Sequence, residues 1–248
     1  MLSSLRLAIS FLTIFPVYKR RAENQELGQS VSYYPLVGLL LGAVAAGICY
    51  LSRYIGLTLA GDVTAVVTLV VLTGGLHLDG LMDTADGIFS GRSCQQKLEI
   101  MKDSRIGAMG AIALGTVLLL KVAFLYELST VPKLTALILA PAAGRWAMVY
   151  GITRFPYARR EGLGSCMKQA GRSQMAVATV TLLAACLWLL GAAGLGVMGF
   201  ILLGTFIATR FIAKCIGGMT GDTYGATGEL IEVWTFLIIL LGQQATIL

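Results

Sequence analysis

The stretch Leu57-Thr-Leu-Ala-Gly-Asp-Val-Thr-Ala-Val-Val-Thr-Leu-Val-Val-Leu-Thr73-Gly-Gly-Leu-His-Leu-Asp79-Gly-Leu-Met-Asp83-Thr-Ala-Asp86-Gly87 joins a long apolar run to three carboxylates. The apolar part is long enough to cross the hydrocarbon core of a membrane as a helix. Asp79, Asp83 and Asp86 lie at positions i, i+4 and i+7, so on a helix they share one face and can converge on one cation or one diphosphate. Acids at a membrane boundary need such a partner.

Composition assigns the chain to the integral membrane proteins. Of its 248 residues, 56% are hydrophobic and 13% are charged, which is far from the averages of soluble proteins. Apolar runs of spanning length predict an all-α polytopic bundle of about seven transmembrane helices, with residues 1–248 forming one integral membrane domain. The first run is rich in glycine, which also suits a re-entrant or tightly packed helix. The runs cover residues 36–52, 57–78, 107–127, 134–152, 174–192, 195–216 and 230–248.

The N-terminal segment, residues 1–30, is predicted to lie along the membrane surface. Its apolar part ends in Phe15-Pro16 and a basic cluster, whereas a signal peptide ends in a cleavage site of small residues. The basic residues Lys19, Arg20 and Arg21 are expected to meet anionic lipid head groups.

Alternate threading of the runs places three loops on the same side of the membrane as the N-terminus: residues 79–106, 153–173 and 217–229. Most Lys and Arg residues follow this division, so the positive-inside rule makes this side cytoplasmic. The sequence therefore predicts a multi-pass protein of the cytoplasmic (inner) membrane with its functional loops facing the cytoplasm.

Carboxylates and basic residues gather on this predicted cytoplasmic face. Acids that hold a cation, beside basic side chains that hold phosphates, suit a metal-assisted site for a polyanionic substrate. The net charge of +6 does not indicate nucleic-acid binding, because the charges are spread over membrane loops without interleaved aromatic residues.

The first loop continues past the aspartates through Arg92 to Lys102, Asp103 and Arg105, with a helix predicted over residues 94–102. Asp103 and Arg105 precede the glycine-rich start of the next span, where backbone N–H groups can also meet a phosphate. A carboxylate so close to a guanidinium suits metal binding beside a diphosphate clamp.

The loop over residues 217–229 repeats this mixture of small and acidic residues. Asp222 and Glu229 are seven positions apart, so they can share a helical face. Arg145 and Arg210 lie within the cytoplasmic halves of their spans, where an unpaired charge is costly. The acids of this loop, or the phosphates of a substrate, are their expected partners.

His77 and the loop over residues 153–173 each allow two interpretations. His77 is the only histidine, and its imidazole suits either a proton acceptor for a hydroxyl nucleophile or a structural role. The loop over residues 153–173 carries Arg159 and Arg160, which suit either binding of an anionic substrate or anchoring to lipid.

The three aspartates would also suit a helix cap or an ion pathway. Acids are common in the first turn of a solvated helix, because they balance its dipole, but a second acidic loop on the same face argues against so general a role. A cation-coupled transporter also uses acids within the membrane, near the midplane and between related repeats. Here the acids cluster at one face, and no convincing internal repeat is visible.

Four motifs in this order resemble the cobalamin synthases, also called adenosylcobinamide-GDP ribazoletransferases. They are Thr73-Gly-Gly-Leu-His-Leu-Asp-Gly-Leu-Met-Asp-Thr-Ala-Asp-Gly87, Leu98-Glu-Ile-Met-Lys-Asp-Ser-Arg-Ile-Gly107, Tyr157-Ala-Arg-Arg-Glu-Gly-Leu-Gly164 and Gly217-Gly-Met-Thr-Gly-Asp-Thr-Tyr-Gly-Ala226. The resemblance spans nearly the whole chain, with no departure at the acidic positions.

This resemblance implies a reaction in which the 5′-hydroxyl of α-ribazole, or of its 5′-phosphate form, attacks the cobinamide-linked phosphorus of adenosylcobinamide-GDP and GMP leaves. It also implies Mg²⁺ as cofactor and the lipid bilayer as surroundings, and leaves a homo-oligomer open. Asp79, Asp83, Asp86 and Asp222 are the expected metal ligands, and His77, Asp103 and Glu229 the expected catalytic residues. The substrate is expected to be bound by Arg92, Lys102, Arg105, Arg145, Arg159, Arg160 and Arg210.

A weaker resemblance connects the start of the acidic motif, Asp79-Gly-Leu-Met-Asp83, to the CDP-alcohol phosphotransferases. The later parts of that pattern are missing here, so this likeness indicates shared reaction logic more than a shared substrate.

Overall fold

The computed structural model describes residues 2–20, 22–159 and 162–245. Its regular structure is helical, apart from an isolated bridge between Tyr157 and Met219, and this confirms the all-α fold class. The elements are α1 (Leu2–Leu12), α2 (Asn24–Ser30), η1 (Val31–Tyr33), α3 (Tyr34–Tyr54), α4 (Thr58–Leu72), α5 (Leu76–Ile88), α6 (Cys94–Ile100), α7 (Ala108–Glu127), α8 (Thr130–Arg154), α9 (Leu163–Cys166), η2 (Met167–Gln169), α10 (Arg172–Leu190), α11 (Ala193–Ile216) and α12 (Gly221–Gln244).

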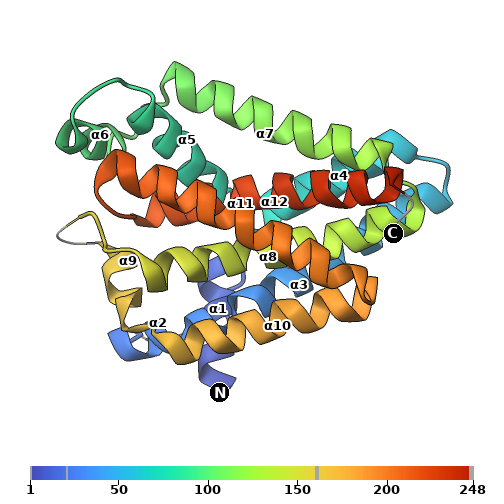
Figure 1. Cartoon of the computed structure of the whole chain (residues 1–248), viewed down its shortest axis with the longest axis horizontal. Coiled ribbons are helices and arrows are strands. Elements are labelled where there is room, and N and C mark those ends of the chain that lie inside the picture. The colour runs from blue at the N-terminus through green and yellow to red at the C-terminus, as the bar shows by residue number, and fades with distance from the viewer. Residues whose placement is uncertain (1, 21, 160–161, 246–248) are drawn as a thin grey trace.

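The long helices confirm a multi-pass membrane protein. Within the described residues, 6 helices are long and apolar enough to cross a membrane, and α4 with α5 raises the number to 7 if that bent pair is one span. The glycine-rich first run, whose nature was open, forms the full-length helix α3 of 21 residues. Figure 1 shows the long helices side by side, with α5 and α6 at one end of the bundle and the C-terminus at the other.

Helix α8 lies at the centre of the bundle, packed against α3, α10 and α12. Its many alanines and its two glycines are buried, because small side chains let neighbouring backbones approach closely. A Cβ atom on Gly38 of α3 would lie 2.5 Å from the carbonyl oxygen of Pro141 in α8. The two helices therefore touch main chain to main chain.

The apolar run over residues 57–78 does not form one straight helix, and the predicted end of this span was wrong. Helix α4 ends at Leu72, and Gly74 and Gly75 have φ values of +60° and +72°. This left-handed conformation suits glycine and ends a helix. The chain then bends by 87° into α5, so the three aspartates lie on a separate helix that follows the bend.

The last span also begins earlier than predicted. Helix α12 starts at Gly221 and ends at Gln244, so most of the predicted loop over residues 217–229 is helical. The Thr220 hydroxyl accepts a hydrogen bond from the backbone N–H of Thr223, and the Thr223 hydroxyl accepts one from the backbone N–H of Thr220. Glycines disfavour a helix in isolation, but here they allow close packing: a Cβ on Gly144 of α8 would lie 2.7 Å from the Gly228 carbonyl oxygen.

The N-terminal helix α1 packs against α2 and α3, and the chain just after it contacts the bend between α4 and α5. The backbone N–H of Ile14, just after α1, donates to the Leu72 carbonyl at 2.9 Å, and the Phe11 ring stacks on Tyr34 of α3 with centroids 6.1 Å apart. With 11 residues, α1 is too short to cross a membrane. Its placement along the membrane surface stays a prediction, whereas the helix predicted over residues 94–102 is confirmed by α6.

An ion pair ties α4 to α8 near the opposite end of the bundle. Lys133 Nζ lies 2.6 Å from Asp62 Oδ2, and both side chains are buried. The Cys49 thiol of α3 donates to the same carboxylate at 3.4 Å. Because each charge has its partner, the pair is tolerated in the apolar interior.

Candidate active site

Helices α5 and α12 run antiparallel in direct main-chain contact, and this contact builds the site. A Cβ atom on Gly80 of α5 would lie 2.6 Å from the Asp222 carbonyl oxygen, and one on Gly225 of α12 would lie 3.0 Å from the His77 Cα. With no side chain between the helices at these two points, Asp79 and Asp83 are carried next to Asp222.

We expect Gly80→Ala to lower both stability and activity. The added methyl group would overlap the Asp222 backbone, which cannot move aside as a flexible side chain can, so the helices must separate at the acids. Thermal unfolding of the purified protein and initial rates of its catalysed reaction would measure the two effects. The matched control is Gly47→Ala in α3, where a Cβ would meet nothing within 4 Å and helix propensity favours alanine. Equal behaviour of the two variants would contradict the packing argument.

The carboxylates of α5 and α12 form one electrostatic group. Asp83 is half-buried and is acted on by the negative charges of Asp79, Asp222 and Asp86 and by the positive charge of Arg159. Arg159 Nη2 lies 2.7 Å from Asp222 Oδ2, with the two side chains 14% and 25% exposed. Among the described residues, Arg159 is the guanidinium that pairs with this group, so negative charge remains for a cation to balance.

The donor chemistry of this group fits Mg²⁺. Carboxylate oxygens are its preferred protein ligands, and it is usually held by one or two carboxylates together with substrate phosphates and waters. No ready-made set of three or more His, Cys, Asp or Glu side chains for a metal exists among the described residues. A cation shared with a diphosphate does not require one, so the predicted ligand set Asp79, Asp83, Asp86 and Asp222 stays a prediction.

Asp86 also forms hydrogen bonds with the start of α7. Its carboxylate accepts hydrogen bonds from the backbone N–H groups of Gly107 and Gly110, both at 2.8 Å. These groups lie at the start of α7, where helical N–H groups lack partners within the helix. Asp86 therefore anchors the N-terminus of α7 to α5.

A cavity of about 270 Å³ lies beneath the acids. Its polar lining comes from Asp79 and His77 of α5, Asp222 and Tyr224 of α12, and Arg159 of the loop after α8. Asp79 is exposed, whereas His77 and Tyr224 are each 2% exposed. The carboxylates therefore lie at the mouth of the cavity, and the histidine and tyrosine form part of its buried wall.

A buried ionic network lies behind His77. Arg145 of α8 forms an ion pair with Glu232 of α12 and contacts His77 Nδ1 at 3.1 Å. Lys121 of α7 donates to Glu229 and to Glu232, each at 2.6 Å. All five side chains are buried. Glu229, a predicted catalytic residue, is thus paired with Lys121 inside the bundle. Arg145, a predicted substrate ligand, pairs with Glu232 rather than with the acids of residues 217–229 that were expected as its partners.

Asp103, another predicted catalytic residue, lies in the loop between α6 and α7. Hydrogen bonds from the side chain and backbone of Arg105 hold the pKa of its carboxyl at about 2. A carboxylate of so low a pKa is a weak proton acceptor at neutral pH. The Arg105 side chain itself is 87% exposed.

The remaining predicted substrate ligands are dispersed. Arg92 and Lys102 are exposed around α6, on the same side as the acids. Arg210 is exposed on α11 with its guanidinium 5.4 Å from the centre of the Phe206 ring, and it does not join the acids as expected. Arg160 lies outside the described residues.

Sequence analysis missed three residues of this region: Lys121, Tyr224 and Glu232. A signal existed for the two charged ones, because Lys121, Arg145 and Glu232 are charges within apolar spans and such charges usually pair. For Tyr224 there was no such signal, since its position beside the cavity follows from the early start of α12.

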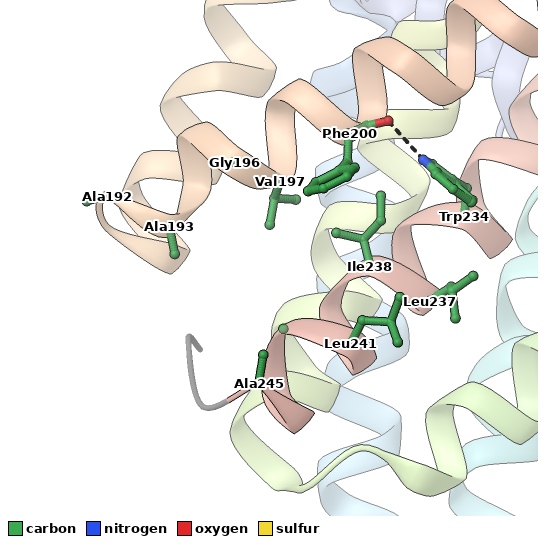
Figure 2. Close-up of a pocket in the computed structure, with 11 residues that line it drawn as sticks. Ala192, Ala193, Gly196, Val197, Phe200, Trp234, Leu237, Ile238, Leu241 and Ala245 are labelled. Carbon is green, nitrogen blue, oxygen red and sulfur yellow. Dashed lines mark hydrogen bonds between the residues drawn. The ribbon is translucent and has the colours of Figure 1, made fainter.

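A larger pocket lies elsewhere and differs in character. It measures about 490 Å³ and lies between α11 and α12 toward the end opposite the acids. Figure 2 shows apolar side chains such as Val197, Phe200 and Leu241 facing it, with the Trp234 indole donating to the Phe200 carbonyl at 2.8 Å. Its lining suits hydrocarbon, whereas the smaller cavity brings acids, a guanidinium and a histidine together.

Comparisons with known proteins show the family to which this chain belongs. A family model described as cobalamin-5-phosphate synthase matches residues 4–240. A protein of Desulforamulus reducens named adenosylcobinamide-GDP ribazoletransferase is 66% identical over 249 residues, covering 100% of both chains. Proteins of the same name from Roseiflexus sp. and Citrobacter koseri are 43% and 40% identical, covering 97% and 94% of this chain and 90% and 97% of their own. Among solved structures, none matches the chain.

Proposed function

Because this chain belongs to the cobalamin-5-phosphate synthase family, we propose that it joins α-ribazole, or its 5′-phosphate, to adenosylcobinamide-GDP with release of GMP. The product is adenosylcobalamin or its 5′-phosphate. One observation carries the proposal: Asp79 and Asp222 line the mouth of one cavity, where Arg159 pairs with Asp222. Because the chain belongs to this family of transferases, we set aside the alternatives of a transporter and of a CDP-alcohol phosphotransferase.

We assign cation binding to the carboxylates of α5 and α12. Asp79, Asp83 and Asp222 would hold Mg²⁺, with Asp86 as a fourth acid of the group. When bound, the cation would neutralise charge on the diphosphate and stabilise the leaving GMP. Arg159 would bind a phosphate oxygen beside Asp222, since a guanidinium suits phosphate as well as carboxylate.

The attacking 5′-hydroxyl must lose its proton as its oxygen bonds to phosphorus and the bond to GMP breaks. Glu229 is engaged with Lys121, and Asp103 is held as a weak base by Arg105. The carboxylates at the cavity mouth are nearer to where the reaction would occur. We therefore propose that one carboxylate of this group accepts the proton while the others hold the cation.

The exposed basic residues Arg92, Lys102 and Arg105 lie around the same end of the bundle, where they can attract the anionic adenosylcobinamide-GDP. Under the positive-inside rule this end faces the cytoplasm, where nucleotide substrates are available. The proposal thus places a multi-pass enzyme in the inner membrane with its reaction on the cytoplasmic side.

Purified protein in lipid vesicles, given Mg²⁺, adenosylcobinamide-GDP and α-ribazole, should release GMP. Omission of α-ribazole should stop the release, because the hydroxyl nucleophile is then missing. Removal of Mg²⁺ by a chelator should stop it as well, and added Mg²⁺ should restore it. Folded protein in intact vesicles that releases no GMP would refute the proposed activity.

A further inference from the structure

Three buried polar atoms around the cavity have no hydrogen-bond partner within the described part of the chain: His77 Nε2, the Tyr224 hydroxyl and Arg159 Nε. Buried polar groups are normally paired, and leaving one unpaired costs free energy. Three such atoms around one cavity indicate that a ligand with hydrogen-bonding groups completes them.

The hydrogen on the His77 ring can be assigned from its neighbour. Arg145 Nη2 lies 3.1 Å from His77 Nδ1, and a guanidinium has hydrogens to donate but no acceptor. Nδ1 must therefore accept, so the ring hydrogen sits on Nε2. His77 is thus a neutral imidazole whose Nε2–H is available as a donor.

The network behind His77 holds this arrangement. Glu232 fixes Arg145 through their ion pair, and Lys121 fixes Glu232 at 2.6 Å. Because every member is buried, the charges cannot exchange their partners for water. Arg145 is therefore kept against Nδ1, and Nε2–H is kept as the free donor.

The shape and lining of the cavity limit what can fill it. Its apolar lining comes from Phe11, Leu76, Met148, Ile152 and Met167. A volume of about 270 Å³ lies just below the range of roughly 300–1,000 Å³ typical of drug-sized ligands. An aromatic nucleoside fits these limits, whereas a corrinoid is far too large to enter.

We propose that this cavity is the binding site of the nucleoside acceptor, whose oxygens accept hydrogen bonds from His77 Nε2–H and from the Tyr224 hydroxyl. The aromatic base lies against the apolar lining. The 5′ end of the nucleoside points to the acids at the mouth, where the corrinoid diphosphate is bound from outside. This inference rests on the proposed function and gives His77 a role in binding the nucleoside, in place of the proton acceptor considered from the sequence.

Two substitutions test the donors by the Michaelis constants of the two substrates. Tyr224→Phe removes one donor and should raise KM for α-ribazole about five- to tenfold, in line with one lost hydrogen bond, with KM for adenosylcobinamide-GDP unchanged. His77→Gln can present an amide N–H near the position of Nε2, so kcat should stay within about tenfold of wild type. A general base removed in the same way would cost about 10²–10⁴-fold in kcat.

The control for the tyrosine substitution is Tyr126→Phe, an exposed tyrosine near the far end of α7, which should leave both KM values unchanged. Thermal unfolding should show that each variant is folded. A rise in KM for adenosylcobinamide-GDP alone, or a loss of at least 100-fold in kcat for His77→Gln with unchanged KM values, would overturn the inference.

Binding of α-ribazole alone, measured by calorimetry on the purified protein, separates this inference from the proposed reaction. The expected result is saturable binding that Tyr224→Phe weakens about five- to tenfold. Binding without GMP release would leave the cavity assignment in place and refute the reaction. GMP release with α-ribazole affinity unaltered by Tyr224→Phe would support the reaction and refute the cavity assignment.

Discussion

Replacement of Asp83 by asparagine is expected to lower kcat for GMP release by about 10²–10³-fold, because a carboxylate-held cation contributes several kcal/mol of charge stabilisation in such reactions. Asparagine keeps the shape of the side chain and removes its charge. The loss should be greatest at limiting Mg²⁺ and should shrink as Mg²⁺ is raised. Initial rates over a Mg²⁺ titration measure both effects.

In contrast to its activity, the stability of the Asp83→Asn variant is expected to stay the same or to rise. Asp83 is acted on by the negative charges of Asp79, Asp222 and Asp86, so removing its charge relieves repulsion and should not lower the free energy of unfolding. The control is Glu99→Gln on the exposed side of α6, which should keep activity within about twofold, as surface substitutions usually do. Full activity of Asp83→Asn at limiting Mg²⁺ would remove Asp83 from the proposed cation site.

Replacement of Glu232 by glutamine is expected to destabilise the bundle strongly. Glu232 pairs with both Arg145 and Lys121 at a buried position. Removing one partner of a buried ion pair costs about 3–5 kcal/mol, since a charge is left without compensation. Thermal or denaturant unfolding in a fixed detergent should show a lower midpoint and a lower yield of folded protein.

The control for this prediction is Glu127→Gln, an exposed acid at the far end of α7. It should unfold like the wild type, because exposed charges contribute little to stability. If Glu232→Gln unfolded like Glu127→Gln, the network would have no structural importance. A folded Glu232→Gln variant is further expected to bind α-ribazole more weakly, because Arg145 would be less firmly held against His77.

Most of the fold could be predicted from apolar runs, because helix length and lipid thickness are directly related. The run over residues 107–127 corresponds to α7, and that over residues 195–216 to α11. The two errors concern glycines. At Gly74 and Gly75 the apolar pattern continues although the backbone turns, and at the start of α12 the glycines suggest a loop although neighbouring helices stabilise a helix.

The site could be predicted only in part, because sequence spacing shows which residues share a helix but not how separate helices face one another. The spacing of Asp79, Asp83 and Asp86 correctly placed them on one helix, and threading correctly brought Asp222 to the same end. Sequence spacing does not reveal which charges are already engaged by other residues. Asp86 anchors α7 and Glu229 pairs with Lys121, and both contacts depend on how separate helices face one another.

The main-chain contact between α5 and α12 has a consequence for how this protein can vary over evolutionary time. Gly80 and Gly225 bring backbone against backbone, so the separation of the acid-bearing helices does not depend on the fit of any side chain between them. Exposed residues on α7, α10 and α11 can therefore change without altering this contact. The distance between the acids of the two helices is independent of such changes as long as both glycines remain.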